Sequence, residues 1–422
     1  MNMMIGRKCF DVMIRSKLLV SSVLTFFLFL TASAECANTI VIQDLPTGIK
    51  SNMGRFVSFR YMRHVWITPG ENVCATVVQQ GGYNSHSLAL YRTTDGGLNW
   101  EFALDISQDF DLISDGVLDV NNDILLVPTD FVKNKIVDVT FIRLVYEPLL
   151  KTWTIAPASP RLVFQSDANM MATRATVAID GNGVIWITFR VHDVVNDTWF
   201  FKVSYSNDDG VTWQDSGCEF GNKNAVSEKC AKILAVGSGV GLVYQDSKIL
   251  GSTEYRLKKW AYRDNTQGLG DPWQEEQIIA QMYDQAGDVY GSHWSVAADW
   301  SGNVHLSFQD YGIRYAKYVG WKNAWEPSVP ITANGIYSNI SVGVDNDVFL
   351  AQDVAALSHR YLFGKQFDAK TGAWSTPFRL SHAYSGKLRM CLPEKFKKNL
   401  PILFQTEISP PYELMYTLIQ RN

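Results

Sequence analysis

One short stretch of the sequence contains three kinds of side chain that can act on a sugar. Residues 290–294 are Tyr-Gly-Ser-His-Trp, so two possible proton carriers stand beside a tryptophan on which a sugar ring could stack. β-Elimination from a uronate needs such a proton carrier and a cation that neutralises the sugar carboxylate. The candidate proton carriers are His293, Tyr290 and Tyr311, and the candidate cations are Arg174 and Arg63.

Hydrolysis is the alternative chemistry, and it would use two carboxyl groups. One group acts as the acid and the other as the base or nucleophile, and their separation decides the stereochemical outcome. Asp115 could pair in this way with Asp284, Asp288 or Asp310. A third possibility is a protein that binds a glycan or another protein without cleaving it, because histidine, arginine and tryptophan suit binding equally well.

The elements that would position these residues repeat along the chain. Similar segments end in tryptophan at intervals of roughly 50 to 60 residues, at Trp100, Trp153, Trp213, Trp273, Trp325 and Trp374. Upstream of each tryptophan lie alternating polar and apolar residues, as in FFKVSYSNDDG, and a strand pair around a tight turn, as in VAIDGNGVIWITFR. This alternation, interrupted by Asp, Asn and Gly, predicts antiparallel hairpins.

Each repeat therefore predicts four short antiparallel strands, which is the pattern of a propeller blade. We expect an all-β propeller of seven four-stranded blades, with six blades as the alternative. The last unit begins near Lys387 and has no tryptophan-bearing outer strand of its own. A strand from the N-terminus, around Ile40–Gln43 or Arg55–Arg60, should complete this blade and close the ring.

Ligands of propellers bind at one mouth of the central channel. Residues just before each innermost strand and just after each second strand line that mouth, and most of these positions are polar or ionisable here. The pattern predicts a solvated funnel for a polar ligand. The expected catalytic residues are Asp115, His293 and Tyr311, and the expected substrate-binding residues are Arg63, His64, Arg174, His192, Tyr290 and Trp294.

Two turns carry a sharper motif than the others. Residues 93–100 are Thr-Thr-Asp-Gly-Gly-Leu-Asn-Trp and residues 206–213 are Ser-Asn-Asp-Asp-Gly-Val-Thr-Trp. Both resemble the Asp box, or BNR repeat, of the sialidase-like propellers. In such a turn the aspartate accepts backbone N–H bonds, the glycine takes a positive φ and the tryptophan packs between sheets. The residues expected to have these structural roles are Asp95, Gly97, Trp100, Asp208, Gly210 and Trp213.

The resemblance implies a glycan-active or glycan-binding propeller, because that superfamily includes sialidases, other glycoside hydrolases, polysaccharide lyases and binding proteins. Sialidases have Arg-Ile-Pro before the first blade, whereas this chain has Arg-Tyr-Met-Arg at residues 60–63. They also have an acidic residue after the second strand of that blade, where residues 79–86 contain no carboxylate. Cleavage of sialic acid is therefore not expected.

The N-terminus predicts export. Four basic residues precede an apolar run at residues 18–30, and Ala32-Ser33-Ala34 follows, as in a cleavable signal peptide. We expect residues 1–34 to be removed and residues 35–422 to form a single propeller domain in a secreted or periplasmic protein. The mature chain then has 34 basic and 41 acidic residues. The expected partner is an extracellular polysaccharide or glycoconjugate, and neither nucleic acid nor a membrane is expected. An anionic substrate would need a local cationic pocket.

The cysteines predict two disulfides in an oxidising compartment. Cys218 and Cys230 are twelve residues apart in a polar stretch, and Cys74 and Cys391 lie in the first and last repeats. With Cys36, five cysteines remain after cleavage of the signal peptide, so one thiol should be free. No Cys or His spacing is typical of a metal site, and we expect neither a metal nor a cofactor.

Overall fold

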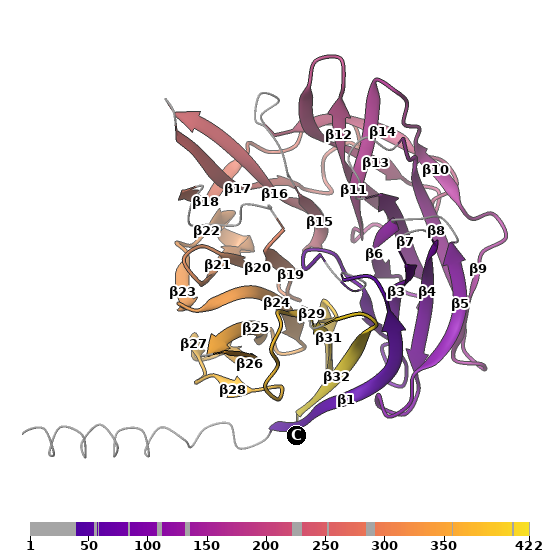
Figure 1. Cartoon of the computed structure of the whole chain (residues 1–422). Helices are drawn as coiled ribbons and strands as arrows, with labels where there is room; N and C mark the ends of the chain where they lie inside the picture. The colour runs from indigo at the N-terminus through magenta and orange to yellow at the C-terminus, as the bar shows by residue number, and fades with distance from the viewer. Residues whose placement is uncertain are drawn as a thin grey trace, which may run out of the picture.

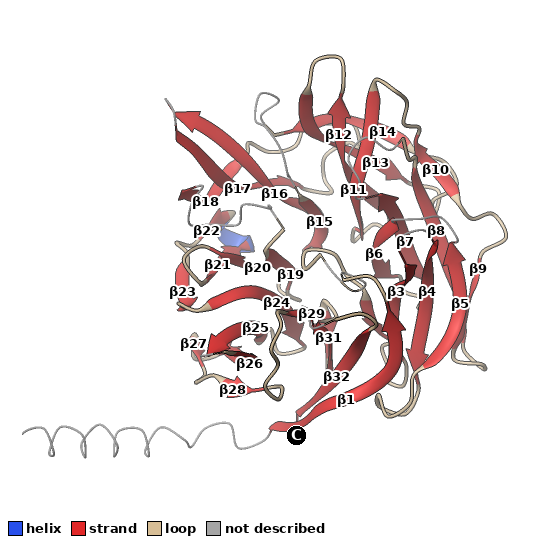
Figure 2. Ribbon diagram, viewed as in Figure 1, coloured by secondary structure: helices blue, strands red, loops and turns tan. Residues whose placement is uncertain are grey.

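The computed structural model describes residues 39–54, 57, 59–82, 85–107, 112–130, 136–221, 230–250, 253–283, 292–356, 358–406 and 409–421. Within these residues nearly all regular structure is β-strand, and the exception is one 3-10 turn, η1 (Gly320–Lys322) (Figure 2). No helix in this part of the chain has the length and hydropathy needed to cross a membrane. Seven antiparallel sheets stand around a central channel, so the chain is an all-β seven-bladed propeller (Figure 1).

The first four blades follow one another along the chain, and each begins with its innermost strand. Blade 1 contains β2 (Val65–Ile67), β3 (Cys74–Gly82), β4 (Ser85–Thr93) and β5 (Glu101–Ser107). Blade 2 contains β6 (Leu112–Leu118), β7 (Ile124–Asp130) and β8 (Val139–Glu147), and β9 (Thr152–Ile155) and β10 (Arg161–Phe164) both pair with β8. Blade 3 contains β11 (Met170–Ile179), β12 (Ile185–Asp193), β13 (Thr198–Ser206) and β14 (Gln214–Phe220). Blade 4 contains β15 (Ala231–Val236), β16 (Gly239–Leu250), β17 (Thr253–Arg263) and β18 (Gln277–Tyr283).

The last three blades complete the ring. Blade 5 contains β19 (Trp294–Ala298), β20 (Val304–Gln309) and β21 (Ile313–Val319), with β22 (Ala324–Trp325) and β23 (Val329–Thr332) on β21. Blade 6 contains β24 (Gly335–Gly343), β25 (Val348–Ala356) and β26 (His359–Asp368), with β27 (Ala373–Trp374) and β28 (Phe378–Arg379) on β26. Blade 7 contains β29 (Leu388–Cys391), β31 (Asn399–Thr406), β32 (Tyr412–Arg421) and β1 (Thr39–Ser51), while β30 (Lys395–Phe396) pairs in parallel with β24.

The N-terminal strand closes the ring, as the sequence predicts. β1 pairs with β32 from Thr39 opposite Arg421 to Ser51 opposite Tyr412, so the two ends of the chain share blade 7 (Figure 1). The closing strand is therefore the segment around Ile40–Gln43, and the alternative of six blades is wrong. Closure covers sheet edges that would otherwise be open to pairing with another chain.

The repeated tryptophans pack each blade against the one before it. Trp213 of blade 3 lies 5.3 Å from the ring of Phe141 in blade 2, and Trp374 of blade 6 lies 5.0 Å from Tyr315 in blade 5. Trp100 of blade 1 lies 5.7 Å from Tyr416 in blade 7, across the closure. Aromatic pairs of this kind contribute about 0.5–1.5 kcal/mol each beyond the burial of their area.

The two turns with the sharper motif have the same internal hydrogen bonds. Asp208 accepts hydrogen bonds from Ser206 Oγ (2.7 Å), Thr212 N (2.9 Å) and Thr212 Oγ1 (2.6 Å), which lower the pKa of its carboxyl to about 2. Asp95 accepts the equivalent bonds from Thr93 and Asn99. Gly97 has a φ of 93°, and a Cβ there would lie 2.1 Å from the Tyr416 ring, so the turn and the blade contact both require glycine. Gly210 has the same role beside Phe141.

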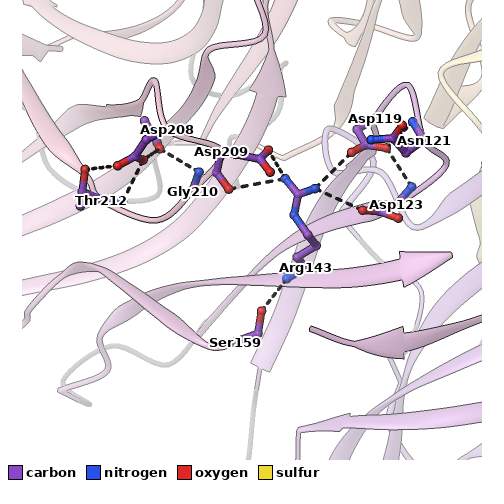
Figure 3. Close-up of polar contacts among 10 residues, drawn as sticks. Asp119, Asn121, Asp123, Arg143, Ser159, Asp208, Asp209, Gly210 and Thr212 are labelled. Atoms are coloured by element: carbon purple, nitrogen blue, oxygen red, sulfur yellow. Dashed lines mark hydrogen bonds and ion pairs between the residues drawn. The ribbon is translucent and has the colours of Figure 1, made fainter. Parts of the chain in front are cut away.

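Arg143 on β8 ties blade 2 to blade 3 (Figure 3). Its guanidinium lies 3.3 Å from Asp119 and 3.1 Å from Asp123, both in the turn after β6, and it also contacts Asp209 in the motif turn of blade 3. The backbone N–H of Arg143 donates to Ser159 Oγ at 3.0 Å. One guanidinium therefore contacts three carboxylates at the joint between two sheets.

The predicted disulfides are absent from the described residues, so both disulfide predictions are wrong. Cys74, Cys218, Cys230 and Cys391 are free thiols. Cys230 is buried beside Arg174, whose Nη1 lies 3.0 Å from its Sγ, whereas Cys218 packs against the cluster between blades 3 and 4. Cys74 and Cys391 share one apolar cluster, and burial raises the pKa of the Cys391 thiol to about 11. Cys36 lies outside the described residues.

Candidate functional site

The ring has two ends, which we name by the direction of the strands. The upper face is the end at which the innermost strands begin and the second strands finish, and the lower face is the opposite end. The sequence places the predicted site on the upper face and the motif turns on the lower face.

The segment Phe59–His64, which leads into β2, fills the upper part of the channel. All six of its residues are buried, with exposed fractions of 4% or less. Asn339 Nδ2 of blade 6 donates to the carbonyl of Arg60 at 3.2 Å, and the ring of Tyr61 stacks on Trp294 of blade 5 at 5.2 Å. In Figure 1 the N-terminal chain bends into the middle of the ring next to β15 and β19. Residues 59–64 therefore fill this part of the channel, and a ligand on the upper face would lie outside this segment.

Arg63 and Asp115 lie inside the wall of the channel and not on its rim. The Arg63 guanidinium donates to Asn339 Oδ1 (3.1 Å), to the carbonyls of Ile340 (3.1 Å) and Leu392 (3.3 Å), and to the carbonyl of Val296. These acceptors belong to blades 5, 6 and 7. Arg63 therefore connects three blades, an arrangement that favours a structural role over binding of substrate. His64 beside it is also buried.

Asp115 on β6 is fully buried and bonded to three neighbours. It accepts hydrogen bonds from Arg63 N (2.6 Å) and Val177 N (2.9 Å), and its Oδ2 lies 2.5 Å from Lys232 Nζ. Burial raises the pKa of this carboxyl, and Lys232 with the two amides partly offsets the rise. Asp284 and Asp288 lie outside the described residues, and the third suggested partner, Asp310, is 3.8 Å from Arg314. This environment favours a structural role for Asp115.

His293, Tyr337 and Arg60 come together on the upper face of blades 5 and 6. The guanidinium of Arg60 lies 3.7 Å above the centre of the Tyr337 ring, and the His293 ring meets Tyr337 edge-on at 4.8 Å. His293 is half-buried, and its Nδ1 lies 2.5 Å from Gln309 Oε1 at the end of β20. If the amide oxygen accepts, a neutral imidazole carries its proton on Nδ1 and its lone pair on Nε2. A cation thus stands beside a histidine and a tyrosine, which is the set that elimination requires.

Asp353, at the end of β25, lies next to this group. It is buried and accepts a hydrogen bond from Arg360 Nη1 at 2.7 Å. Burial raises the pKa of Asp353 to about 6, although Arg360, the backbone N–H of Leu388 and Arg60 all favour its charged form. The carboxyl therefore titrates near neutral pH beside the Arg60 guanidinium.

A second group of cations lies on blades 3 and 4. Arg174 occupies a bulge in β11 at a φ of 56°, and Arg190 Nε donates to Thr173 Oγ1 at 3.1 Å. The Arg190 guanidinium lies 4.2 Å from the ring of Trp199, on which His192 stacks at 3.9 Å. Lys258 Nζ lies 5.1 Å from the ring of Trp294. These cations surround the stacked pair of Tyr61 and Trp294.

The remaining predicted residues have different surroundings. Trp294 is fully buried under Tyr61, so no sugar can stack on its ring in this structure. Tyr311 is 74% exposed in the turn between β20 and β21, with a φ of 48°. His192 lies 3.0 Å from Asp197 and is held against Trp199. Tyr290 lies outside the described residues.

Sequence reasoning missed Tyr337 and the use of Arg60 as the cation. Tyr337 lies two residues before Asn339 in the first part of β24, near the start of an innermost strand, as His293 lies just before β19. A comparison of every residue near these strand starts would have found it. The sequence suggested residues 55–60 only as a possible closing strand, and the path of this segment through the channel is what places Arg60 beside Tyr337. Among the described residues, no cluster of three or more His, Cys, Asp or Glu side chains could hold a metal.

Comparisons with known proteins identify the fold. The sequence matches no protein-family profile and no curated protein. An ulvan lyase of polysaccharide lyase family PL25 has a TM-score of 0.52 at 11% identity, over 89% of this chain and 95% of its own, and was also solved bound to GlcA(1-4)Rha3S. Polysaccharide lyase Uly1 has a TM-score of 0.51 at 10% identity, over 91% of this chain and 98% of its own. The NanB sialidase of Streptococcus pneumoniae has a TM-score of 0.43 at 11% identity, over 91% of this chain and 70% of its own. Identities this low support the shared propeller fold alone.

Proposed function

We propose that this protein is an exported polysaccharide lyase that cleaves a uronate-containing glycan by β-elimination. The observation that carries the proposal is the arrangement of Arg60, His293 and Tyr337 on the upper face. Hydrolysis is less well supported, because the contacts of Asp115 among the described residues are Lys232 and two backbone amides and include no second carboxylate.

The reaction would use each group for one task. Arg60 binds the uronate carboxylate and stabilises the negative charge that develops when the proton on the adjacent carbon, C5, is removed. His293 or Tyr337 takes that proton, the C5–H electron pair forms the C4–C5 double bond, and the C4–O bond breaks. The leaving oxygen takes a proton from the other member of the pair. The products are an unsaturated uronate end and a new reducing end, and no water is consumed.

The cations on the upper face support an anionic substrate. The mature chain has more acidic than basic residues, so its overall field repels polyanions. Three cations, Arg174, Arg190 and Lys258, nevertheless lie near the Tyr61–Trp294 pair, and Arg60 lies over Tyr337. Lysine and arginine are seldom buried this deeply, so their concentration at one place is consistent with recognition of carboxylate or sulfate groups.

The comparisons support the choice of substrate class without deciding it. The two structures described above with TM-scores above 0.5 are polysaccharide lyases, and one of them was also solved with a glucuronate-containing ligand. The likeness of the two lower-face turns to the Asp box agrees with membership of the sialidase-like propellers. The proposal of export depends on the signal peptide expected at residues 1–34, which lie outside the described residues. N-terminal sequencing of the exported protein should find Glu35 as its first residue.

Digestion of a panel of uronate-containing, neutral and sialylated polysaccharides tests the proposal. Only uronate-containing polymers should give products with the ultraviolet absorbance of an unsaturated uronate. His293→Ala should lower kcat about 10²–10⁴-fold, the usual contribution of a general acid or base. His359→Ala is the matched control, because this exposed histidine lies at the upper end of blade 6 outside the cluster.

Other results would contradict the proposal. Equal activities of His293→Ala and His359→Ala would exclude His293 from the chemistry. Retention on one glycan without any cleavage would favour the alternative of a binding protein, and cleavage of neutral polymers alone would remove the need for Arg60. Arg60→Gln should lower kcat on uronate polymers by about 10²–10³-fold, as expected for loss of a charge-stabilising donor.

A further inference from the structure

The lower face contains a cavity that the proposed reaction does not use. It has a volume of about 410 Å³, within the range of small-molecule sites. One side is formed by the lower ends of β2, β6, β11 and β15, and the other by residues 393–397 and the turn after β2. Because β30 pairs with β24, the connection after β29 passes beneath blade 6 and walls the cavity on that side.

The two walls of the cavity differ in chemistry. The strand ends present aliphatic side chains such as Ile67, Val117 and Ile179, all of them half-buried. The opposite wall presents charged side chains, including Glu394 and Lys395. A ligand that fits both walls has one apolar and one hydrogen-bonding side.

The charged groups are held in place and balance one another. Glu71 accepts hydrogen bonds from the backbone N–H groups of residues 397–399, and Lys397 Nζ donates to the carbonyl of Pro69 at 2.9 Å. Glu394 Oε1 accepts a hydrogen bond from Ala298 N at 3.3 Å. Around the whole cavity, the charged residues are the cations Arg63, Lys395 and Lys397 and the anions Glu71, Asp119 and Glu394. This balance favours a ligand without net charge.

Trp300 stands at the mouth of the cavity. Its side chain is 56% exposed, although its backbone is fixed by a 3.0 Å hydrogen bond from its N–H to Asn346 Oδ1. Lys395 Nζ lies 4.3 Å from the centre of its ring. An indole with an open surface beside hydrogen-bonding groups suits a pyranose, whose C–H side packs on the ring while its hydroxyls bond to the polar wall.

We propose that the lower cavity binds a neutral sugar unit, such as the end or a branch of a glycan chain, and holds it without cleaving it. The described residues that line it include no histidine, tyrosine or cysteine, and its carboxylates already have partners: Glu71 and Glu394 accept backbone N–H groups and Asp119 contacts Arg143. The site lies at the opposite end of the channel from His293 and Arg60. The proposal does not depend on the reaction proposed for the upper face.

Binding of neutral oligosaccharides to the His293→Ala protein tests this site, because cleavage on the upper face is then removed. The probes are xylo-, cello-, manno- and arabino-hexaose, titrated by calorimetry. At least one should bind saturably, and Trp300→Ala should weaken it about tenfold or more, as loss of a buried aromatic contact does. Trp321→Ala is the matched control, since Trp321 is 83% exposed on the same face of the same blade but does not line the cavity.

A second variant covers the case in which Trp300→Ala disturbs the fold. Ala235→Phe adds a ring into the cavity from β15, where Ala235 is a half-buried lining residue, and should also abolish binding. Lack of saturable binding by all four probes would overturn the proposal, as would binding that Trp300→Ala and Ala235→Phe leave unchanged. Either result leaves the upper-face reaction unaffected, since that reaction is measured separately on uronate polymers.

Discussion

The substitution Asp115→Asn tests whether Asp115 is a structural or a catalytic residue. The sequence assigns this fully buried carboxylate to the site. Asparagine keeps the shape of the side chain but removes the charge opposite Lys232, whose Nζ lies 2.5 Å away in a fully buried position. It also replaces one of the two oxygens that accept the N–H groups of Arg63 and Val177 with a donor. Removal of one partner from a buried ion pair costs about 3–5 kcal/mol, because the other charge is left uncompensated.

Unfolding in urea, followed by tryptophan fluorescence, measures this loss. The unfolding free energy of Asp115→Asn should fall by about 3–5 kcal/mol, a large part of the 5–15 kcal/mol of a typical protein. Lys232→Met in addition should restore part of the loss, since the unpaired cation is then gone. A variant with unchanged stability and no cleavage would refute this reasoning and identify Asp115 as a catalytic group.

Three further predictions concern the joints between blades and the pH response. Arg143→Gln should lower the unfolding free energy by about 1–3 kcal/mol in urea titrations, because it leaves three carboxylates without their cation in a partly exposed site. Gly97→Ala should lower the thermal midpoint clearly, since its Cβ would overlap the Tyr416 ring at a positive φ; an unchanged midpoint would contradict the assigned turn. Folded Asp353 keeps its proton up to a pKa of about 6, whereas the unfolded chain releases it near 3.8. The unfolding free energy should therefore fall as pH rises from about 4 to 6, and a similar fall in Asp353→Asn would show that another group is responsible.

The architecture follows from repetition in the sequence. The tryptophans recur once in each of the first six blades, and the Asp, Asn and Gly turns between alternating segments mark the hairpins. The number of blades could therefore be predicted, and the closing strand could be narrowed to two N-terminal segments. Asp95 and Asp208 could be placed in turns because their hydrogen bonds are local, within four residues. Local chemistry of this kind is visible in a sequence.

The site was predictable only in part, because its contacts join blades far apart in the chain. His293 could be selected from its position before an innermost strand, but the approach of Arg60 to Tyr337 depends on how residues 59–64 cross the channel. The same positional rule selects Asp115 and Trp294, which are fully buried. Strand alternation does not show whether a residue at the channel faces solvent or the segment that fills it.

The cysteines illustrate the same limit. Spacing suggested a bond between Cys218 and Cys230, yet disulfide formation depends on the distance and direction of the Cβ atoms. In the structure Cys230 lies beside Arg174, while Cys218 lies on β14 in the outer part of blade 3. Neither position could be derived from the number of residues between them.

The masses of the fragments released from a defined uronate oligosaccharide test the central claim most directly. Elimination consumes no water, so the masses of the two fragments should add up to that of the parent, and one fragment should absorb in the ultraviolet. The His359→Ala protein should give the same fragments, and the His293→Ala protein should give almost none. Fragments whose masses together exceed the parent by one water would show hydrolysis and contradict the roles assigned to Arg60, His293 and Tyr337.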